Sequence, residues 1–255
     1  MIKTLVFSAL ATGLAISSVR AAEPDGRLYE LRTYHAEPGK LDALLTRFRD
    51  HTCKLFEKHG MTNVGYWTPV ENQERLLIYL LAYPDRASRD ASWQAFMGDE
   101  EWKKAASASE VEGKLVGKID QSFFTATDFS PGFPAGPGTG NHLYELRTYA
   151  ATPGKLPALH ARFRDHTLGL FAKHGMTNCG YYQLVPGQPA AADTLVYFLA
   201  HANAAAAGKS WDGFRADPDW VSAKAASEKA AGGSLTVPDG VTSVFLTPTD
   251  FSPVK

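Results

Sequence analysis

The chain contains little cysteine and almost no net charge. Only two of its 255 residues are cysteine, and 26 Lys and Arg nearly balance 27 Asp and Glu, which leaves a formal net charge of −1. Proteins that bind nucleic acid non-specifically need many cations to neutralise phosphates, so we expect no nucleic-acid partner. The apolar fraction of 44% and the charged fraction of 21% are those of an ordinary globular protein.

Several signature motifs are also missing. The sequence contains no CxxCH, no HExxH, no phosphate-binding loop and no GxSxG. Covalent haem attachment, zinc-protease chemistry, nucleotide hydrolysis and the α/β-hydrolase mechanism therefore have no support. No metal site is predicted. The sequence identifies neither a cofactor nor a catalytic residue, and it leaves open whether the protein is an enzyme.

The one long hydrophobic run lies at the start. Residues 1–21 begin with a cation at Lys3, continue with an apolar run over Leu5–Ile16 and end with small residues at Val19 and Ala21. This order predicts a signal peptide cleaved after Ala21, and hence a protein exported to the periplasm or secreted. The run is shorter than the ~20 residues of a bilayer span, so we expect no stable membrane span after cleavage.

Export would place the two cysteines in an oxidising compartment, where cysteines usually pair. Cys53 falls on a predicted helix and Cys179 on a predicted strand, and the two do not occupy equivalent positions of the repeat described next. We therefore expect no disulfide bond between them.

What the sequence does contain is an internal repeat. Residues Leu28–Tyr66 and Leu143–Tyr181 align at an offset of 115 and are identical at 30 of 39 positions. A repeat of this length is a whole small domain, and two copies in one chain indicate a built-in pseudo-dimer. We predict domains at 27–129 and 142–252, joined by a Pro- and Gly-rich linker at 130–141 with no packed structure of its own.

Each repeat is predicted to run strand, helix, strand, strand, helix, strand. In the first repeat the predicted strands are 28–34, 63–70, 75–83 and 118–125, and the predicted helices are 40–59 and 85–112, the second broken near Gly98. The third strand, LLIYLLAY, is apolar on both faces, as expected of a strand that is buried on both sides. This order is typical of the α+β ferredoxin-like fold, an antiparallel sheet with both helices on one face. The second repeat could cover the other face as a sandwich of two sheets or by closing a barrel.

The repeats resemble the NIPSNAP family. The resemblance rests on YELRTY followed by PGKL, on a helix ending in KHG and on a following GY, and these occur in both repeats. The tryptophans of SWQAF–x–x–DEEW and SWDGF–x–x–DPDW are also similar to that family. The resemblance implies the dimeric α/β-barrel architecture, formed here by tandem domains within one chain. Mitochondrial relatives are linked to vesicle transport, mitophagy signalling and protein interaction, whereas the predicted signal peptide of this chain implies export.

A polar trio recurs on the first strand of each repeat, as Glu30, Arg32 and Tyr34 and as Glu145, Arg147 and Tyr149. Strand alternation puts each trio on one face, and Tyr29 and Leu31 on the opposite face suit packing beneath the helices. We therefore expect both trios to face the barrel interior, together with Trp67 and Tyr182 of the second strands. Arginine there could bind a carboxylate or phosphate, and glutamate could act as a base if burial raised its pKa. Two structural interpretations stay open: a Glu–Arg network that fixes the pairing of the sheets, or trios that are exposed and paired along the strand.

The secondary candidates are histidines. His51 and His166 are repeat equivalents in RFRDHT and could titrate near neutral pH or bind a metal, although the helical angle of His51 favours a role in capping the core. His160 is expected to be a partly buried core residue, or a cavity histidine of the second repeat alone. His59 and His174 each precede a glycine, which indicates helix capping.

These observations lead to three functional hypotheses. The first is a barrel that binds a small anionic or partly apolar molecule in its interior through the polar trios. The second is a non-enzymatic interaction or scaffold protein with a protein partner, which the family resemblance and the lack of a nucleophile–base motif favour. The third is a metal- or haem-dependent oxygenase or isomerase of the wider barrel superfamily. The repeats could pair within or between chains, and the protein could form a homo-oligomer.

Overall fold

The structure is a computed structural model that describes residues 25–133 and 142–255. The predicted signal peptide at 1–21 and positions 134–141 of the predicted linker lie outside the described residues. In the part of the chain that is described, no helix is long and apolar enough to cross a membrane.

The first repeat folds in the predicted order. Its elements are β1 (Leu28–Ala36), α1 (Leu41–Arg47), the π-helical turn η1 (Phe48–Thr52), α2 (Cys53–Lys58), β2 (Thr62–Pro69), β3 (Leu76–Tyr83), α3 (Arg86–Gly98), α4 (Glu100–Ser109) and β4 (Val116–Ala126). The predicted break near Gly98 is confirmed. Asp99 caps α4 there, because its carboxylate accepts a hydrogen bond of 2.7 Å from the backbone N–H of Glu101.

The second repeat has the same order. Its elements are β5 (Leu143–Ala151), α5 (Leu156–Arg162), the π-helical turn η2 (Phe163–Thr167), α6 (Leu168–Lys173), β6 (Thr177–Leu184), β7 (Thr194–His201), α7 (Ala204–Ala216), α8 (Pro218–Ala230) and β8 (Thr236–Pro248). The equivalence of the repeats therefore extends over whole domains, well beyond the 39 aligned residues.

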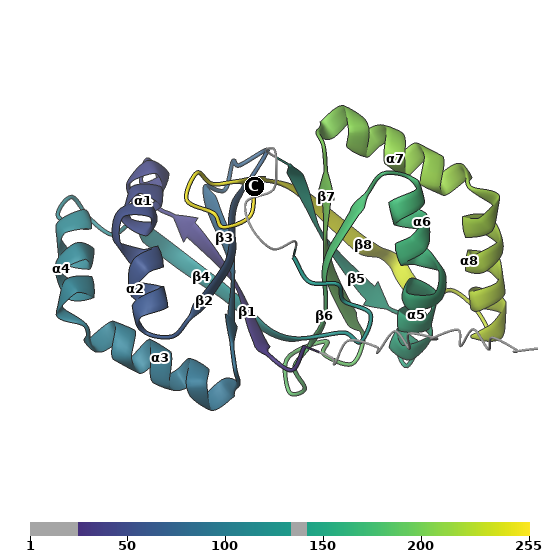
Figure 1. Cartoon of the computed structure of the whole chain (residues 1–255), viewed down its shortest axis with the longest axis horizontal. Coiled ribbons are helices and arrows are strands. Elements are labelled where there is room, and N and C mark those ends of the chain that lie inside the picture. Colours follow the sequence, from purple (N-terminus) through teal and green to yellow (C-terminus); the bar gives the residue numbers. More distant parts are fainter. Residues whose placement is uncertain (1–24, 134–141) are drawn as a thin grey trace, which may run out of the picture.

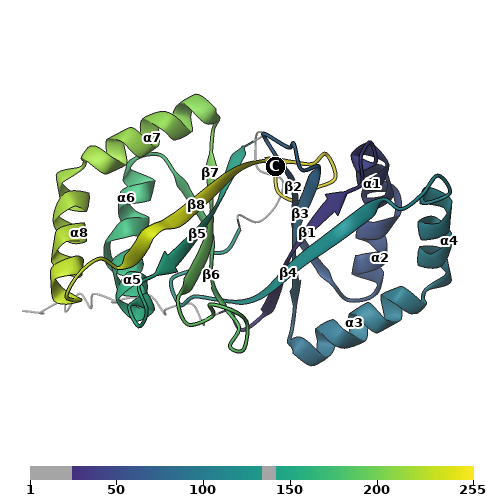
Figure 2. The ribbon, with the colours of Figure 1, turned by 180° about the vertical axis from the view of Figure 1, so that it is seen from behind.

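All eight strands close into one antiparallel barrel, in the order β1-β3-β2-β8-β5-β7-β6-β4. The repeats meet at two short seams, β2 with β8 and β4 with β6. The helices of the first repeat cover one outer side of the strands, and those of the second repeat cover the other (Figures 1 and 2). The α+β ferredoxin-like prediction is thus confirmed, and the repeats pair within one chain as a closed barrel rather than as an open sandwich.

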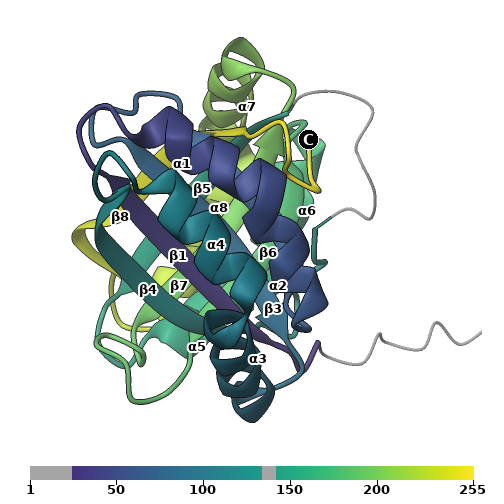
Figure 3. The ribbon, with the colours of Figure 1, turned by 90° about the vertical axis from the view of Figure 1, so that its left-hand side faces the viewer.

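Three apolar clusters fill the layers. Each repeat has one cluster between its strands and its helices. The third cluster lies in the barrel interior and contains residues of both repeats. In Figure 3, α1, α2 and α4 lie in front of the first repeat's strands, with α1 in contact with β3 and α2 in contact with β2. Strand β3 supplies Tyr79 and Leu81 to the helix side and Ile78 and Leu80 to the interior, so its predicted burial on both faces is confirmed.

Trp67 and Tyr182 lie in the barrel interior, as predicted. Each ring folds back over the glycine two positions earlier in its strand. A Cβ atom at Gly65 would lie 2.2 Å from the Trp67 ring, and a Cβ atom at Gly180 would lie 2.2 Å from the Tyr182 hydroxyl. Because any side chain at these positions would displace the ring, both strands require glycine there.

The described part of the predicted linker, residues 130–133, forms no helix or strand and packs against the barrel. The Phe133 ring centroid lies 5.7 Å from that of Trp67 and 5.2 Å from that of Phe198, in the barrel interior. The backbone N–H of Tyr181 donates to the Ser130 hydroxyl at 2.9 Å. The physical reason is that the interior leaves apolar surface that these residues remove from water.

The chain segments after β4 and β8 cross to the other repeat. The first-repeat arm (residues 127–130) follows β4 and lies against the second repeat, where Thr127 N–H donates to the carbonyl of Tyr181 at 2.9 Å. The second-repeat arm (residues 249–252) lies against the first repeat, where Thr249 N–H donates to the carbonyl of Tyr66 at 2.9 Å. In Figure 1 this arm is part of the yellow segment beside β2 and β3. Each repeat is therefore completed by a segment of the other.

The first helix of each repeat is not the single α-helix predicted for 40–59. Within η1 the turn takes an extra residue: Cys53 N–H donates to the carbonyl of Phe48, and the Thr52 hydroxyl donates to the carbonyl of Arg47 at 3.2 Å. The extra residue carries His51 off the apolar stripe, and both His51 and His166 are exposed. The expected core-capping role of His51 is therefore wrong.

The first prediction concerns the glycine beneath Trp67. Gly65→Ala should lower the free energy of unfolding by about 2 kcal/mol, because the added methyl group forces the indole out of its place in a packed interior. Gly98→Ala is the matched control, since a Cβ at Gly98 has no atom within 4 Å and should leave stability unchanged or slightly raised. Urea unfolding of the two variants measures the difference. Equal stabilities would contradict the role assigned to Gly65.

Candidate functional site

The polar trios lie on the helix-facing side of the sheet, so their predicted position in the barrel interior is wrong. Tyr34 belongs to the cluster beneath the first repeat's helices, whereas the Tyr29 ring packs on Tyr182 across the interior, with ring centroids 4.8 Å apart. The alternative interpretation, in which the trios are exposed, is also wrong, because the exposed fraction is 0% for Glu30 and 1% for Glu145. The physical reason is that a buried carboxylate needs hydrogen-bond donors, and helix α3 supplies them on the outer face while the interior cluster is apolar.

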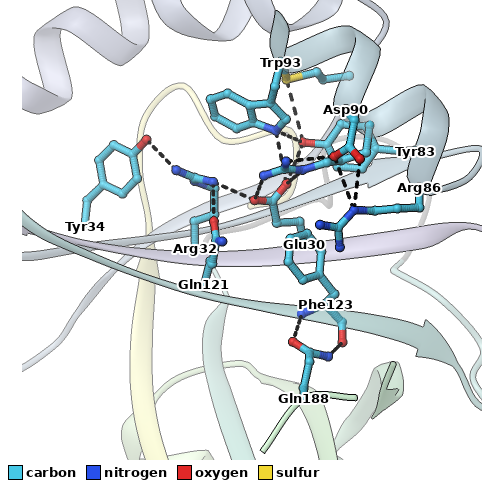
Figure 4. A network of polar contacts seen from close by, with 12 residues as sticks. Glu30, Arg32, Tyr34, Tyr83, Arg86, Asp90, Trp93, Gln121, Phe123 and Gln188 are labelled. Atoms are coloured by element: carbon cyan, nitrogen blue, oxygen red, sulfur yellow. Dashed lines mark hydrogen bonds and ion pairs between the residues drawn. The ribbon is translucent and has the colours of Figure 1, made fainter. Parts of the chain in front are cut away.

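The Glu30 carboxylate is the centre of the first repeat's polar network (Figure 4). Oε1 accepts from Arg32 Nη1 at 2.6 Å and from Arg89 Nη2 at 2.8 Å. Oε2 accepts from Arg89 Nε at 2.9 Å, from the Tyr83 hydroxyl at 3.0 Å and from Trp93 Nε1 at 3.2 Å. Five donors on one carboxylate satisfy a charge that burial would otherwise make very costly.

These donors decide the ionisation of Glu30. Burial alone would raise its pKa, but the hydrogen bonds from Arg89 and the charge of Arg32 outweigh burial and hold the pKa of the carboxyl below its ordinary value of 4.5. Glu30 is therefore a carboxylate at neutral pH and binds its arginines firmly. The suggested role as a base with a raised pKa is wrong for this residue.

The second repeat has a simpler version of the network. Glu145 accepts hydrogen bonds from Arg147, from Trp211 Nε1 at 2.8 Å and from His201 Nε2 at 2.9 Å. His201 stands where the first repeat has Tyr83, and Ala207 stands where it has Arg89. Burial would raise the pKa of Glu145, but its hydrogen bonds and the charge of Arg147 hold it below the ordinary value.

A cavity of 570 Å³ lies between the sheet and the helices of the first repeat. We call it the first-repeat pocket. This volume is in the range of small-molecule sites. Its lining residues come from β1, β4, η1 and the helices α1 to α4: Arg32, Tyr34, Arg47, Phe48, Thr52, Phe56, Arg89, Trp93, Phe96, Met97, Trp102, Ala106, Glu110, Val116, Ile119 and Gln121. The trio residues Arg32 and Tyr34 thus do line a cavity, but one on the opposite side of the sheet from the side expected.

Three arginines meet in this pocket, against one lining carboxylate, that of Glu110. The Arg32 and Arg47 side chains are 9% and 5% exposed, and the Nε atom of each is buried without a hydrogen-bond partner in the described residues. The Arg32 guanidinium lies 4.4 Å from the Trp93 ring centroid, and the Arg47 guanidinium lies 5.2 Å from that of Trp102. The tryptophan faces hold these cations in place while leaving donors unused.

The structure does not gather the candidate histidines and cysteines into a reactive site. Within residues 25–133 and 142–255, no three His, Cys, Asp or Glu side chains are placed to hold a metal ion. His160 is half-buried against the Phe129 ring at 5.5 Å, as a partly buried residue rather than a cavity histidine, and burial lowers its pKa. Burial raises the pKa of both Cys53 and Cys179 to about 12, so neither is a thiolate at neutral pH, and both are free.

His59 and His174 lie at the C-caps of α2 and α6, as predicted, and each is followed by a glycine with φ of 78°. The ring of His59 also contacts the Asp99 carboxylate at 2.7 Å, and His174 contacts Asp217 at 2.6 Å. These histidines therefore connect the first helix of each repeat to the second, and they line no part of the first-repeat pocket.

Several residues of the pocket are not among those predicted from the sequence. Arg47 recurs in both copies of RFRDHT, so the repeat itself could have indicated it. Trp93 and Trp102 also have equivalents in the second repeat. Arg89 has none, and no sequence pattern connects it to Glu30, which is 59 residues away. Only the packing of α3 on the sheet brings the two together.

Comparison with known proteins identifies both repeats. The NIPSNAP family model matches residues 29–131 and 144–253. Protein NipSnap homolog 3B of Mus musculus is 27% identical over 236 residues, which cover 91% of this chain and 88% of that protein. Protein NipSnap homolog 3A of Homo sapiens is 28% identical over 163 residues, which cover 63% of this chain and 60% of that protein.

Two solved structures share the whole barrel. Each carries the name "putative monooxygenase", one from Fusobacterium nucleatum and one from Lactobacillus acidophilus. The first has a TM-score of 0.55 at 9% identity and covers 87% of this chain and 92% of its own. The second has a TM-score of 0.52 at 8% identity and covers 88% of this chain and 94% of its own. At such low identity the similarity concerns the fold alone.

The second prediction follows from the buried carboxylate. Glu30→Gln should lower the free energy of unfolding at pH 7 by about 3 kcal/mol, because Arg32 and Arg89 lose their shared counter-charge in a buried site. The pKa of Glu30 is lower in the folded state than in the unfolded state. The difference in unfolding free energy between the wild type and Glu30→Gln should therefore be complete above pH 4.5, and it should shrink below that pH as the wild-type carboxyl takes up a proton.

Glu112→Gln is the matched control for this prediction, since the Glu112 side chain is 91% exposed. Its stability should stay close to that of the wild type at every pH. Denaturant unfolding between pH 3 and pH 8 measures both variants. A loss in Glu30→Gln that is independent of pH would contradict the proposed ionisation.

Proposed function

The chain belongs to the NIPSNAP family, and we propose that this member binds one small molecule per chain, an anion with an apolar body, in the first-repeat pocket. The observation that carries the proposal is the pair of buried guanidinium groups, Arg32 and Arg47, which both belong to residues lining the pocket and each have an Nε atom without a hydrogen-bond partner in the described residues. Buried guanidinium groups are normally well hydrogen-bonded, and an anionic ligand in the pocket would supply these arginines with a further acceptor and a counter-charge.

The charge of the pocket wall supports an anion. Arginines outnumber carboxylates by three to one among the lining residues, and Glu30 behind the wall is already shared by Arg32 and Arg89. The second repeat has the equivalent pair, Arg147 and Arg162, whose Nε atoms are also buried without a partner in the described residues, but Ala207 stands in place of the third arginine. We therefore assign the site to the first repeat alone, at one ligand per chain.

The remaining wall supports an apolar, planar body. Aromatic rings from five elements line the pocket, namely Tyr34 of β1, Phe48 of η1, Phe56 of α2, Trp93 and Phe96 of α3, and Trp102 of α4. Such rings bind flat apolar groups by stacking and edge contacts. The proposed ligand is of the class predicted from the sequence, but we place it beneath the helices. Aromatic side chains occupy the barrel interior, where the sequence predicted the site.

An oxygenase reaction has less support. The two barrel neighbours are named as monooxygenases, but that similarity is one of fold. The pocket wall contains no His, Cys or Asp side chain, and its one carboxylate, Glu110, is paired with Arg47 at 3.0 Å. Ligand binding is therefore better supported than oxygenase chemistry at this pocket.

The third prediction tests the pocket with a matched pair of probes, 2-naphthoate and the neutral 2-naphthalenemethanol. We expect the wild type to bind naphthoate at one site per chain and to bind the alcohol about tenfold more weakly, since a charge-assisted hydrogen bond contributes about 1.5 kcal/mol or more. Isothermal titration calorimetry measures both the stoichiometry and the affinity.

Arginine variants locate the site within the chain. Arg47→Gln should weaken naphthoate binding about tenfold, whereas Arg162→Gln, the equivalent change in the second repeat, should leave it unchanged. Circular dichroism of both variants controls for folding. Equal affinity for the two probes, or equal effects of the two substitutions, would contradict the assignment. Native mass spectrometry of protein from its own compartment would then identify the natural ligand by its mass.

A second candidate function, protein interaction, is favoured by the edge of β4. Residues 116–122 of this strand pair with β1, whereas pairing with β6 begins at the seam near Phe124. An incompletely paired strand offers backbone donors and acceptors to an added strand. Ile119→Pro removes a backbone N–H on the side of β4 that faces away from β1. A crosslinking pull-down from native extract that captures a stoichiometric partner with the wild type, but not with Ile119→Pro, would support this function, and the absence of any such partner would count against it.

Export is the last part of the proposal, and the segment 1–21 supports it. The mature chain would then begin at Ala22 and would be found in the periplasm or outside the cell. Intact-mass measurement of protein from fractionated cells tests this directly. A full-length mass in the cytoplasmic fraction would contradict it.

A further inference from the structure

The RFRDHT segment of the first repeat connects the pocket to the other half of the molecule. Arg47, Phe48 and Thr52 line the first-repeat pocket. Arg49 lies between them in the sequence but does not line the pocket. Its guanidinium group donates to both carboxylate oxygens of Asp250, at 2.6 and 2.7 Å. Neighbouring residues on one π-helical turn therefore contact a candidate ligand site and the second-repeat arm.

The second-repeat arm is fixed at several points where it meets this turn. The Ser252 hydroxyl accepts from the backbone N–H of Tyr66 at 3.0 Å. The Phe251 ring stacks near Phe48, with centroids 6.4 Å apart and planes 26° apart, and it also packs against Tyr66 at 5.5 Å. The arm thus holds the turn through an aromatic contact on Phe48 and an ion pair on Arg49.

A π-helical turn needs such support more than an α-helix does. Turns with i→i+5 hydrogen bonds are rare, occur mostly as single insertions inside α-helices and are frequent at functional sites. The Arg47 carbonyl is satisfied within the turn by the Thr52 hydroxyl at 3.2 Å. Outside the turn, the two-oxygen contact with Asp250 constrains the direction of Arg49, and with it the neighbouring backbone.

We infer that Asp250 is a positioning residue for the first-repeat pocket: through Arg49, the second repeat's arm fixes η1 and so places Arg47 and Phe48 against the ligand. The inference deepens the proposed function and rests on it for the identity of the site. It makes the pocket a shared product of both repeats, although every residue that lines it comes from the first.

Exposure separates this role from a purely stabilising one. The Arg49 and Asp250 side chains are 41% and 64% exposed. Ion pairs this exposed contribute little to global stability. Loss of the Asp250 charge should therefore change the local order of η1 more than the stability of the fold.

The pseudo-symmetry of the chain supplies a matched control. Asp128 of the first-repeat arm binds Arg164 on the second repeat's turn η2 in the same two-oxygen manner, at 2.6 and 2.8 Å. Asp128→Asn and Asp250→Asn remove equivalent ion pairs with equivalent exposure. Of the two, only the Arg49–Asp250 pair involves η1, the turn that lines the first-repeat pocket.

The test measures both variants in two ways, on the full chain. Hydrogen–deuterium exchange compares residues 47–52 with 162–167, and calorimetry measures the affinity for 2-naphthoate. We expect Asp250→Asn to speed exchange over 47–52 and to weaken naphthoate binding about fivefold, with Asp128→Asn speeding exchange over 162–167 and leaving the affinity unchanged. The charge-swapped pair Arg49→Asp with Asp250→Arg should restore slow exchange and recover most of the affinity.

The outcomes distinguish the inference from the proposed function. If Asp250→Asn leaves exchange over 47–52 unchanged, or weakens binding no more than Asp128→Asn does, the positioning role is wrong. If the wild type binds no naphthoate, the proposed function fails, and the exchange data alone then decide whether Asp250 orders the turn. Equal melting temperatures of the two variants exclude a difference in global stability as the cause.

Discussion

A ferredoxin-like sheet has two apolar faces, and its own helices cover one of them. The constraint that governs this molecule is the need to remove the other face from water. Strand β3 makes the need unavoidable, because Ile78 and Leu80 are as apolar as Tyr79 and Leu81 on its opposite side. The second repeat satisfies the constraint by placing its own uncovered face against the first, which yields a closed barrel and leaves a single interior shared by both repeats.

The position of the charges follows from that constraint. An interior formed by two apolar sheet faces offers few donors to an ionised group, so the carboxylates of β1 and β5 lie on the helix side instead. There Glu30 receives an indole, a phenol and two guanidinium groups, and Glu145 receives an indole, an imidazole and one guanidinium group. The Glu–Arg network is structural in both repeats. In the first repeat it also holds Arg32 at the wall of a cavity, so that a structural ion pair and a candidate binding site share one residue.

Much of this architecture could be predicted from the sequence, because it depends on patterns of short range. The repeat, the element order, the helix break near Gly98 and the interior positions of Trp67 and Tyr182 all follow from local spacing. Strand alternation also showed correctly that Glu30, Arg32 and Tyr34 share a face. It could not decide which face, since both sides of the sheet are buried and the usual contrast between apolar and polar sides is lost.

The remaining features depend on contacts between distant segments. Arg89 reaches Glu30 only because α3 folds back over the sheet. The α-helical periodicity assumed for 40–59 does not hold through the π-helical turn η1, and it therefore misplaced His51. The exchange of arms between the repeats explains why TDFSP recurs, since Asp128 and Asp250 each serve the opposite repeat, but the motif alone does not show where it binds.

The replacement of Arg89 by Ala207, and of Tyr83 by His201, has a consequence for how such a barrel can change over time. In a barrel built from two separate identical chains, every mutation appears twice, and a change that improves one half is imposed on the other. Tandem duplication removes that coupling. One repeat can keep the residues that maintain the barrel while the other acquires a new specificity. The exchanged arms still hold each repeat in place against the other.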